Sequence, residues 1–271
     1  MEKKNSLLIL MLALLVGGII VLSCPPFAAQ AQTRATFFLV FRDDFDTFNT
    51  TLWQKADGWT NGDHFNAWWQ ADNASFSDGI LSLQLDDEGC PGGCGGVDYA
   101  SAEYRSNSHY HYGIYTVRMK SVAQDGVVST FFLYTGPSEG NPWDEIDIEI
   151  TGNHPTQMQT NYFTNGVGDH EYQIDLGFDA SADFHTYSIE WMPDTIRWYV
   201  DGSLVHTEDG SRGTLPSTPG RIMLNFWPGA DSLNGWLGDF VYSGPKQAQY
   251  DWVSYEAVDW PIKSYIPAIF R

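Results

Sequence analysis

Trp143-Asp144-Glu145-Ile146-Asp147-Ile148-Glu149-Ile150 is the stretch that decides the fold, because polar and apolar side chains alternate along it. Such alternation is typical of a half-buried β-strand, in which successive side chains point to opposite faces of a sheet. The pattern predicts one face of isoleucines that packs on a core. The opposite face would carry Trp143, Glu145, Asp147 and Glu149.

The acidic face of this strand indicates glycosidase chemistry. Three neighbouring carboxylates repel each other, so fold stability gives little reason to place them beside a tryptophan. Retaining glycoside hydrolysis needs a carboxylate nucleophile and a carboxylic acid about 5 to 5.5 Å apart, and Glu145 and Glu149 are the candidates. On a flat strand their Cα atoms would lie roughly 13 Å apart, so the side chains must lean inward or the strand must curve. Asp147 would then hydrogen-bond the nucleophile and help to hold the proton on Glu149. The alternative is a solvated acidic face, or a set of ligands for a structural cation.

The rest of the chain consists of short alternating segments separated by turn residues. With 26 Gly and no long helical pattern, this spacing predicts an all-β fold, an antiparallel β-sandwich in one domain. Asp201-Gly202 would close a hairpin. The predicted strands are 37–41, 80–85, 113–120, 127–134, 143–150, 157–164, 185–191, 195–200, 203–206, 221–227 and 249–255.

The N-terminus has the three parts of a secretion signal. Charged residues precede an apolar run at 7–22, and small residues follow at Ala29-Gln30-Ala31. The run is shorter than the roughly 20 residues of a membrane-spanning helix. We therefore expect residues 1–31 to be removed, so that the protein is secreted and extracellular.

Removal of the signal would leave a domain at 32–258 and a C-terminal tail at 259–271. A lipoprotein modified at Cys24 is the alternative, although Leu22 and the prolines after Cys24 fit a lipobox poorly. Cleavage after residue 31 also leaves Cys90 and Cys94 as an even pair, which we expect to form a disulfide across the glycine-containing loop between them.

The formal net charge of −20 argues against nucleic acids and anionic membranes as partners, because binding to phosphate depends on Lys and Arg. Neutral polymers remain possible partners. The sequence contains no nucleophilic-serine motif, no zinc-protease motif and no nucleotide-binding loop. His109 and His111 have one-face spacing, yet no further ligand follows at metal spacing, so an ordinary strand position is favoured.

Aromatic residues make up 15% of the chain, including 11 Trp. Indole and phenol rings stack on the apolar faces of pyranose rings, while core packing is the alternative for each of them. Glycines flank Trp236, so we expect it on an exposed loop. The candidates for sugar stacking are Trp59, Phe132, Tyr134, Trp143, Trp227 and Trp236.

Together, these residues carry a family resemblance. The strand at 143–149 resembles the active-site signature of glycoside hydrolase family 16, in its form without an extra bulge residue. The chain from about residue 41 to residue 255 is similar to the bacterial lichenases, the endo-β-1,3-1,4-glucanases of that family. Further matching blocks lie at 53–58, 161–166, 175–180, 198–202 and 250–253.

The resemblance implies a β-jelly-roll of two curved sheets with an open groove, and a retaining double displacement on a β-glucan. Glu145 would be the nucleophile, Glu149 the acid and then the base, and Asp147 the assisting carboxylate. It implies no catalytic cofactor, and we expect a monomer. By matching position, the sugar contacts would be Asn61, Glu103, Arg105, Phe132, Tyr134, Trp143, Asn161, Glu171, Asn225, Trp227 and Trp236.

The resemblance also implies a structural calcium ion on the convex side. Its ligands would be the Asp251 side chain and the backbone carbonyls of about Asp44 and Gly79, which are hard oxygen donors suited to that ion. One departure concerns the tyrosine that the family places next to the nucleophile, which is Phe163 here. This change removes a hydroxyl from the innermost sugar contact.

Two other functions stay open. The bulge-free signature is shared with enzymes of the family that hydrolyse or transglycosylate xyloglucan or β-1,3-glucan. A non-catalytic carbohydrate-binding protein on the same sandwich is the third possibility, although a pure binder has no need for both glutamates.

Overall fold

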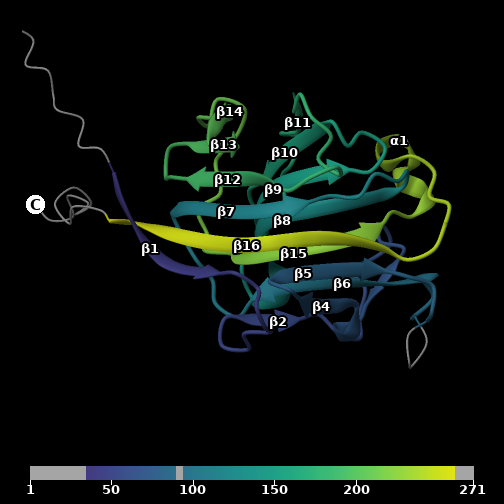
Figure 1. The fold of residues 1–271 in the computed structure, drawn as a ribbon. Coiled ribbons are helices and arrows are strands. Elements are labelled where there is room, and N and C mark those ends of the chain that lie inside the picture. The colour runs from purple at the N-terminus through teal and green to yellow at the C-terminus, as the bar shows by residue number, and fades with distance from the viewer. Residues whose placement is uncertain (1–34, 90–93, 260–271) are drawn as a thin grey trace, which may run out of the picture. The chain divides into compact units, whose positions relative to one another are not determined.

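The computed structural model describes residues 35–89 and 94–259 (Figure 1). The predicted signal peptide and the end of the predicted tail, from residue 260, lie outside the described residues. So does Cys90, and with it the predicted bridge to Cys94. The predicted β-sandwich is confirmed, because the described chain forms two eight-stranded sheets in which all pairs but one are antiparallel.

The first sheet packs against the apolar face of the acidic strand. Its strands, in spatial order, are β14 (Ser203–Glu208), β13 (Ile196–Val200), β12 (His185–Trp191), β7 (Gly113–Lys120), β16 (Lys246–Asp259), β5 (Ile80–Leu85) and β4 (Ala74–Ser77), with β1 (Thr36–Asp43) beside β16.

The second sheet carries the acidic strand near its middle. Its strands, in spatial order, are β11 (Tyr172–Asp175), β10 (Gln157–Phe163), β9 (Asp144–Thr151), β8 (Val127–Thr135), β15 (Arg221–Pro228), β6 (Tyr99–Ser106) and β2 (Trp53–Lys55), with β3 (Ala67–Trp69) parallel to β6.

Every predicted segment overlaps a strand, and β5, β7 and β12 begin and end as predicted. The strands β2, β3, β4, β6 and β11 were not predicted. In β6, six of the eight residues are buried, so small and polar residues occupy both faces and the sequence does not alternate. The prediction of a loop at Trp236 is wrong, because this residue lies in the one-turn helix α1 (Asn234–Leu237).

The core lies between the two sheets and includes the isoleucine face of β9, as predicted. Ile146, Ile148 and Ile150 are at most 1% exposed. They belong to the same buried cluster as residues of the first sheet, such as Tyr187 and Trp198. Burial of a side chain of this size is worth roughly 1.5–3 kcal/mol, so this face fixes which way the acidic residues point.

Two aromatic side chains of the first sheet also hold the backbone of the second. Trp198 Nε1 donates to the backbone carbonyl of Asp147 at 3.0 Å, and the Tyr250 hydroxyl donates to that of Thr130 at 2.9 Å. Both hydrogen bonds are buried, and buried polar groups are costly unless they are paired. The backbones of the acidic strand and of its neighbour β8 are therefore held by side chains of the first sheet.

The helices of the described ranges are all short. Besides α1 they are the 3₁₀ turns Ala71–Asn73, Pro137–Glu139 and Asp231–Leu233. Within residues 35–89 and 94–259, no helix has the length and apolar character needed to cross a membrane.

Candidate active site

The acidic side chains of β9 open onto one hollow of about 100 Å³. Because β9 lies between β8 and β10, its outward side chains have neighbours on both sides. The structure therefore brings together the three carboxylates that the sequence analysis singled out. The hollow is lined by Phe65, Thr130, Phe132, Glu145, Asp147, Glu149, Asn225 and Trp227.

The strand register arranges these side chains in rows across the sheet. Glu149 lies between Thr130 and Gln159, and Asp147 lies between Phe132 and Asn161. Glu145 is flanked in the same way, by Tyr134 of β8 and Phe163 of β10. Each carboxylate thus has an amide or aromatic side chain from β10 on one side and a β8 side chain on the other.

Glu145 has two side-chain hydrogen-bond partners among the described residues. Trp143 Nε1 donates to its Oε2 at 2.6 Å, and the carboxyl of Asp147 is its second hydrogen-bond partner. Burial raises the pKa of Glu145 to about 7, and both hydrogen bonds act to lower that pKa. The bond to Glu145 raises the pKa of Asp147, which burial and the neighbouring carboxylates already raise well above its usual range. This is the pattern expected when Asp147 carries the proton and Glu145 the charge.

Within the described part of the chain, Glu149 has one side-chain donor. Gln159 Nε2 donates to its Oε2 at 2.7 Å. Burial raises the pKa of Glu149 to about 8, and the charges of Glu145 and Glu171 raise it further. With fewer donors and more like charges around it, Glu149 is the carboxyl that holds a proton at neutral pH.

Trp143 is stacked on Phe163, with their ring centroids 4.9 Å apart and the rings 12° from parallel. The side chain of Trp143 is 38% exposed. Phe163 thus orients the indole that donates to Glu145. An exposed indole beside a carboxylate can contact the apolar face of a sugar.

A second polar group lies on β6 and β15. Glu103 is 1% exposed, and burial raises its pKa. Asn61 Nδ2 and Asn225 Nδ2 donate to its Oε2 at 3.0 and 3.4 Å. Arg105 Nη1 lies 3.9 Å from Oε1, and its guanidinium lies over the ring of Trp59 at 4.8 Å. The structure brings these five predicted residues together, with Glu103 as their buried anchor.

Next to β9, side chains of β10 hydrogen-bond the residue before β11 and the helical turn α1. Asn161 Nδ2 donates to Glu171 Oε1 at 3.3 Å. Trp236 Nε1 donates to Gln159 Oε1 at 3.2 Å. Trp227 lines the hollow but is only 6% exposed, because Phe65 packs against it with the two ring centroids 4.0 Å apart. For Trp227, core packing and groove lining apply together.

The sequence analysis missed Thr130 and Phe65, which line the hollow, and Gln159, which contacts Glu149. Gln159 is the hydrogen-bond donor to Glu149, and Gln173 Nε2 in turn donates to Gln159 Oε1 at 2.5 Å. The signal was present, since Gln157, Gln159 and Asn161 alternate with apolar or small residues along a predicted strand. A polar face next to an acidic face marks the same side of the sheet.

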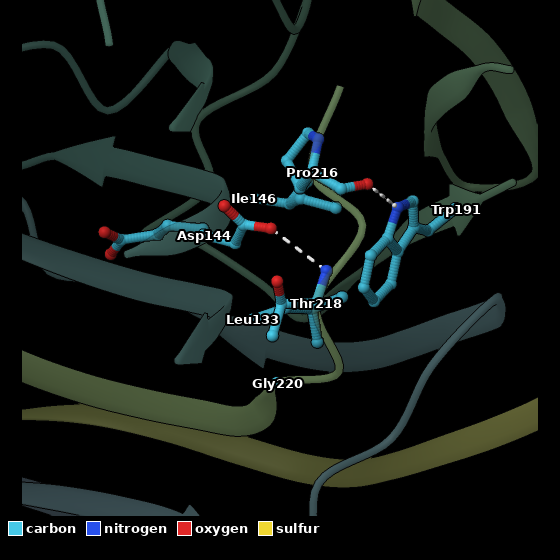
Figure 2. A pocket seen from close by; sticks show the side chains of 8 residues that line it. Leu133, Asp144, Ile146, Trp191, Pro216, Thr218 and Gly220 are labelled. Carbon is cyan, nitrogen blue, oxygen red and sulfur yellow. Dashed lines mark hydrogen bonds between the residues drawn. The ribbon is translucent and has the colours of Figure 1, made fainter. Parts of the chain in front are cut away.

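Asp144, at the start of β9, anchors the strand from the side opposite the hollow. Its buried carboxylate accepts from the backbone N–H groups of Asn165, Ser217 and Thr218, each at 3.0 Å. Figure 2 shows this carboxylate turned toward Thr218, in a small pocket that Trp191 also lines. The residue before Glu145 is thus fixed to two loops.

Strand pairing places the predicted calcium ligands in neighbouring segments of the first sheet. On β16, Tyr250 pairs with Leu81 of β5, and Val253 pairs with Asp43 of β1, so Asp251 lies between the segments that lead to Gly79 and Asp44. A Cβ atom on Gly79 would lie 3.6 Å from the Asp44 carbonyl oxygen. In the structure, Asp251 is ion-paired with Arg118. Within the described ranges, no group of three or more His, Cys, Asp or Glu side chains is arranged to hold a metal ion.

Comparison with known proteins supports the family resemblance. The family model described as "Glycosyl hydrolases family 16" matches residues 61–254. The chain is 49% identical over 217 residues to a β-glucanase of Paenibacillus polymyxa, an alignment that covers 80% of this chain and 87% of the relative. It is 45% identical over 246 residues to a β-glucanase of Bacillus subtilis, with 90% and 96% covered.

A solved structure agrees with these matches. The crystal structure of a prokaryotic β-1,3-1,4-glucanase (lichenase) from a mouse hindgut metagenome superposes with a TM-score of 0.75 at 48% identity, and the match covers 79% of this chain and 97% of that one. The matched family segment contains β9 and every residue that lines the hollow. The chain therefore belongs to glycosyl hydrolases family 16.

Proposed function

We propose that this protein is an endo-β-1,3-1,4-glucanase that hydrolyses mixed-linkage β-glucan with retention. The observation that carries the proposal is the unequal environment of two glutamates on one hollow. Among the described residues, Glu145 has two side-chain hydrogen-bond donors and Glu149 has one, so Glu145 is the more readily ionised of the two carboxyls. The lichenase and β-glucanase relatives indicate the substrate class.

The first chemical step would form a covalent glycosyl enzyme. A Glu145 carboxylate oxygen attacks C1 of the sugar, the bond between C1 and the glycosidic oxygen breaks, and protonated Glu149 gives its proton to the leaving oxygen. Trp143 and Asp147 hold Glu145 for the attack through their hydrogen bonds. Asp147 keeps its own proton during this step.

The second step would release the product. Glu149, now a carboxylate, takes a proton from a water molecule, whose oxygen attacks C1 and displaces Glu145. Gln159 keeps the Glu149 carboxyl in place through both steps. Two displacements at C1 restore the original anomeric configuration.

A polymer substrate would lie across the strands of the second sheet. Polar and aromatic side chains follow one another from Arg105 on β6, through β15, β8 and β9, to Gln173 on β11. Side chains across this width can contact several sugar units on both sides of the cleaved bond. Internal cleavage of a chain follows from such an arrangement more readily than removal of terminal sugars.

A calcium ion would stabilise the fold rather than take part in catalysis. Asp251 and the backbone carbonyls of Asp44 and Gly79 are hard oxygen donors that converge through the strand register. Calcium would compete with Arg118 for the Asp251 carboxylate. We further propose that the protein is secreted after loss of residues 1–31, and that it works as a monomer.

The test is product analysis on barley β-glucan, with laminarin and xyloglucan as alternative substrates. We expect the wild type to release mixed-linkage oligosaccharides from barley β-glucan and little from the other two polymers. Glu145→Gln and Glu149→Gln should each lower the rate by several orders of magnitude. A rate near that of the wild type in either variant would contradict the mechanism, and preference for xyloglucan would contradict the substrate.

A further inference from the structure

The loop that follows β14 holds residues 169–171 through one arginine, a contact that we call the clamp. Arg212 Nη1 donates to the backbone carbonyl of His170 at 3.0 Å. Its Nη2 lies 3.4 Å from the carbonyl oxygen of Asp169 and 3.3 Å from that of Glu171. One guanidinium thus bonds three consecutive carbonyls, and its planar fork of donors suits such a task better than the ammonium of lysine.

A buried carboxylate holds this arginine. Glu208, the last residue of β14, is 2% exposed, and its Oε1 accepts from Arg212 Nη1 at 2.7 Å. His206 Nε2 lies 3.0 Å from the same oxygen. A carboxylate buried to this extent needs a cationic or hydrogen-bonding partner, so the position of Arg212 is set by the core rather than by solvent.

The clamped segment leads into the active site. Within it, the backbone N–H of His170 donates to Asn161 Oδ1 at 3.3 Å, and Asn161 Nδ2 donates to Glu171 Oε1. Asn161 is the register partner of Asp147. A chain of contacts therefore runs from Glu208 through Arg212 to the Glu171 carboxylate, which lies beside the row of catalytic carboxylates.

The clamp also has to hold a constrained backbone. Asp169 has a φ of +66°, a left-handed conformation that residues with side chains other than Asn and Asp seldom adopt. His170 is buried and stacked on Tyr162, with ring centroids 3.8 Å apart. Arg212 adds hydrogen bonds to the backbone carbonyls of this loop.

We propose that Arg212 is a positioning residue for substrate binding: locked by Glu208, it fixes residues 169–171 and thereby holds the Glu171 carboxylate toward the sugar. This inference rests on the proposed function, because Glu171 is a sugar contact only if the hollow binds a glycan. A contact of this kind is made equally in the ground state and the transition state, so its loss raises KM more than it lowers kcat.

The experiment compares Arg212→Gln, Glu171→Gln and the double variant on barley β-glucan. Each single change is expected to raise KM about fivefold with kcat within about twofold, the order of one ordinary hydrogen bond. If Arg212 acts through Glu171, the double variant has no higher KM than Glu171→Gln alone. Arg197→Gln is the matched control, because Arg197 is also a partly exposed arginine paired with a glutamate, Glu190.

Hydrogen exchange separates this inference from the proposed function. The His170 amide should exchange faster in Arg212→Gln than in the wild type, and Arg197→Gln should leave it unchanged, whether or not the protein cleaves glucan. A wild type that releases no sugar from any β-glucan would refute the proposed function alone. Unchanged exchange at His170 would overturn the clamp, and a KM for Arg212→Gln equal to that of the wild type, or multiplying effects in the double variant, would overturn its role in binding.

Discussion

Replacement of Asp144 by asparagine tests whether the catalytic strand depends on its anchor. The carboxylate accepts three backbone N–H bonds, one through Oδ1 and two through Oδ2. An asparagine keeps one oxygen and presents an NH₂ group to the remaining donor or donors. In its better orientation the oxygen serves Ser217 and Thr218, and the NH₂ group faces the N–H of Asn165, which then has no acceptor.

The expected cost follows from these three bonds. A hydrogen bond to a charged group contributes about 1.5–3 kcal/mol, and an unsatisfied buried donor costs about 1–3 kcal/mol. One lost bond and two that become neutral should together destabilise the fold by about 3 kcal/mol. For a domain of this size, 1 kcal/mol shifts Tm by about 2–4 °C. We therefore expect Tm to fall by about 6–12 °C.

The variant should also be slower at a temperature where it is folded. Asn165 and Gly166 form one turn, and the Gly166 N–H donates to the Trp143 carbonyl at 2.8 Å. Loss of the Asp144 anchor frees this turn, and with it the indole that orients Glu145. We expect kcat at 25 °C to fall about threefold to tenfold, as for loss of about 1 kcal/mol of positioning.

Differential scanning calorimetry and initial rates on barley β-glucan measure the two effects. Asp194→Asn is the matched control, because Asp194 is an exposed residue whose carboxylate accepts a hydrogen bond from the Thr195 hydroxyl. Its Tm should stay within about 2 °C of the wild type, as surface changes usually do. If Asp144→Asn melts within the same 2 °C, the anchor contributes little, and the account of how β9 is held is wrong.

Three further predictions concern the proposed catalytic acid, the proposed calcium site and the core. Glu149→Gln should abolish hydrolysis and raise Tm at pH 8. Burial raises the pKa of Glu149 to about 8 in the folded protein, so wild-type stability that is fully present below the ordinary pKa of a glutamate is lost as pH rises through about 8. The gain in Tm from the substitution should therefore vanish toward pH 4.5, and wild-type kcat should fall above about pH 8. Calcium should raise the Tm of the wild type relative to chelator but not that of Asp251→Asn, and equal shifts in both would exclude Asp251 as a ligand. Trp198→Phe removes the bond to the Asp147 carbonyl and should cost about 1–2 kcal/mol and lower kcat more than it changes KM; an unchanged kcat would show that this bond does not position the strand.

Much of the fold could be predicted from local alternation. Strands with one buried face, such as β5, β7 and β12, show period-two patterns and were predicted to the residue. Alternation fails where both faces of a strand are buried, as in β6, and where a strand has only three or four residues. The sandwich was thus predictable from its regular members, while β6 was not predicted and its residues Glu103 and Arg105 were named only through the family resemblance.

The local pattern of the site was predictable, but the contacts between residues distant in sequence were not. The acidic face of β9 is a local pattern, and its three carboxylates do line one hollow. The contacts that give them different environments come from residues far away in sequence, such as Trp198, which is 51 positions from Asp147. Arg212 shows the same limit, since it lies 42 positions from the carbonyl it binds. No periodicity links such pairs, because only the packing of the strands brings them together.

The strand β9 combines buried carboxylates, which oppose folding, with several anchoring contacts. Burial raises the pKa of Glu145, Asp147 and Glu149, so keeping even one of them ionised at neutral pH opposes folding. The same strand is held by a buried isoleucine face, by the Asp144 carboxylate and by the indole of Trp198. These contacts lie on the core side and at the start of the strand, so they add stability without neutralising the groove. A site that must keep carboxylates partly desolvated for acid catalysis therefore needs its compensation in residues that never contact the substrate.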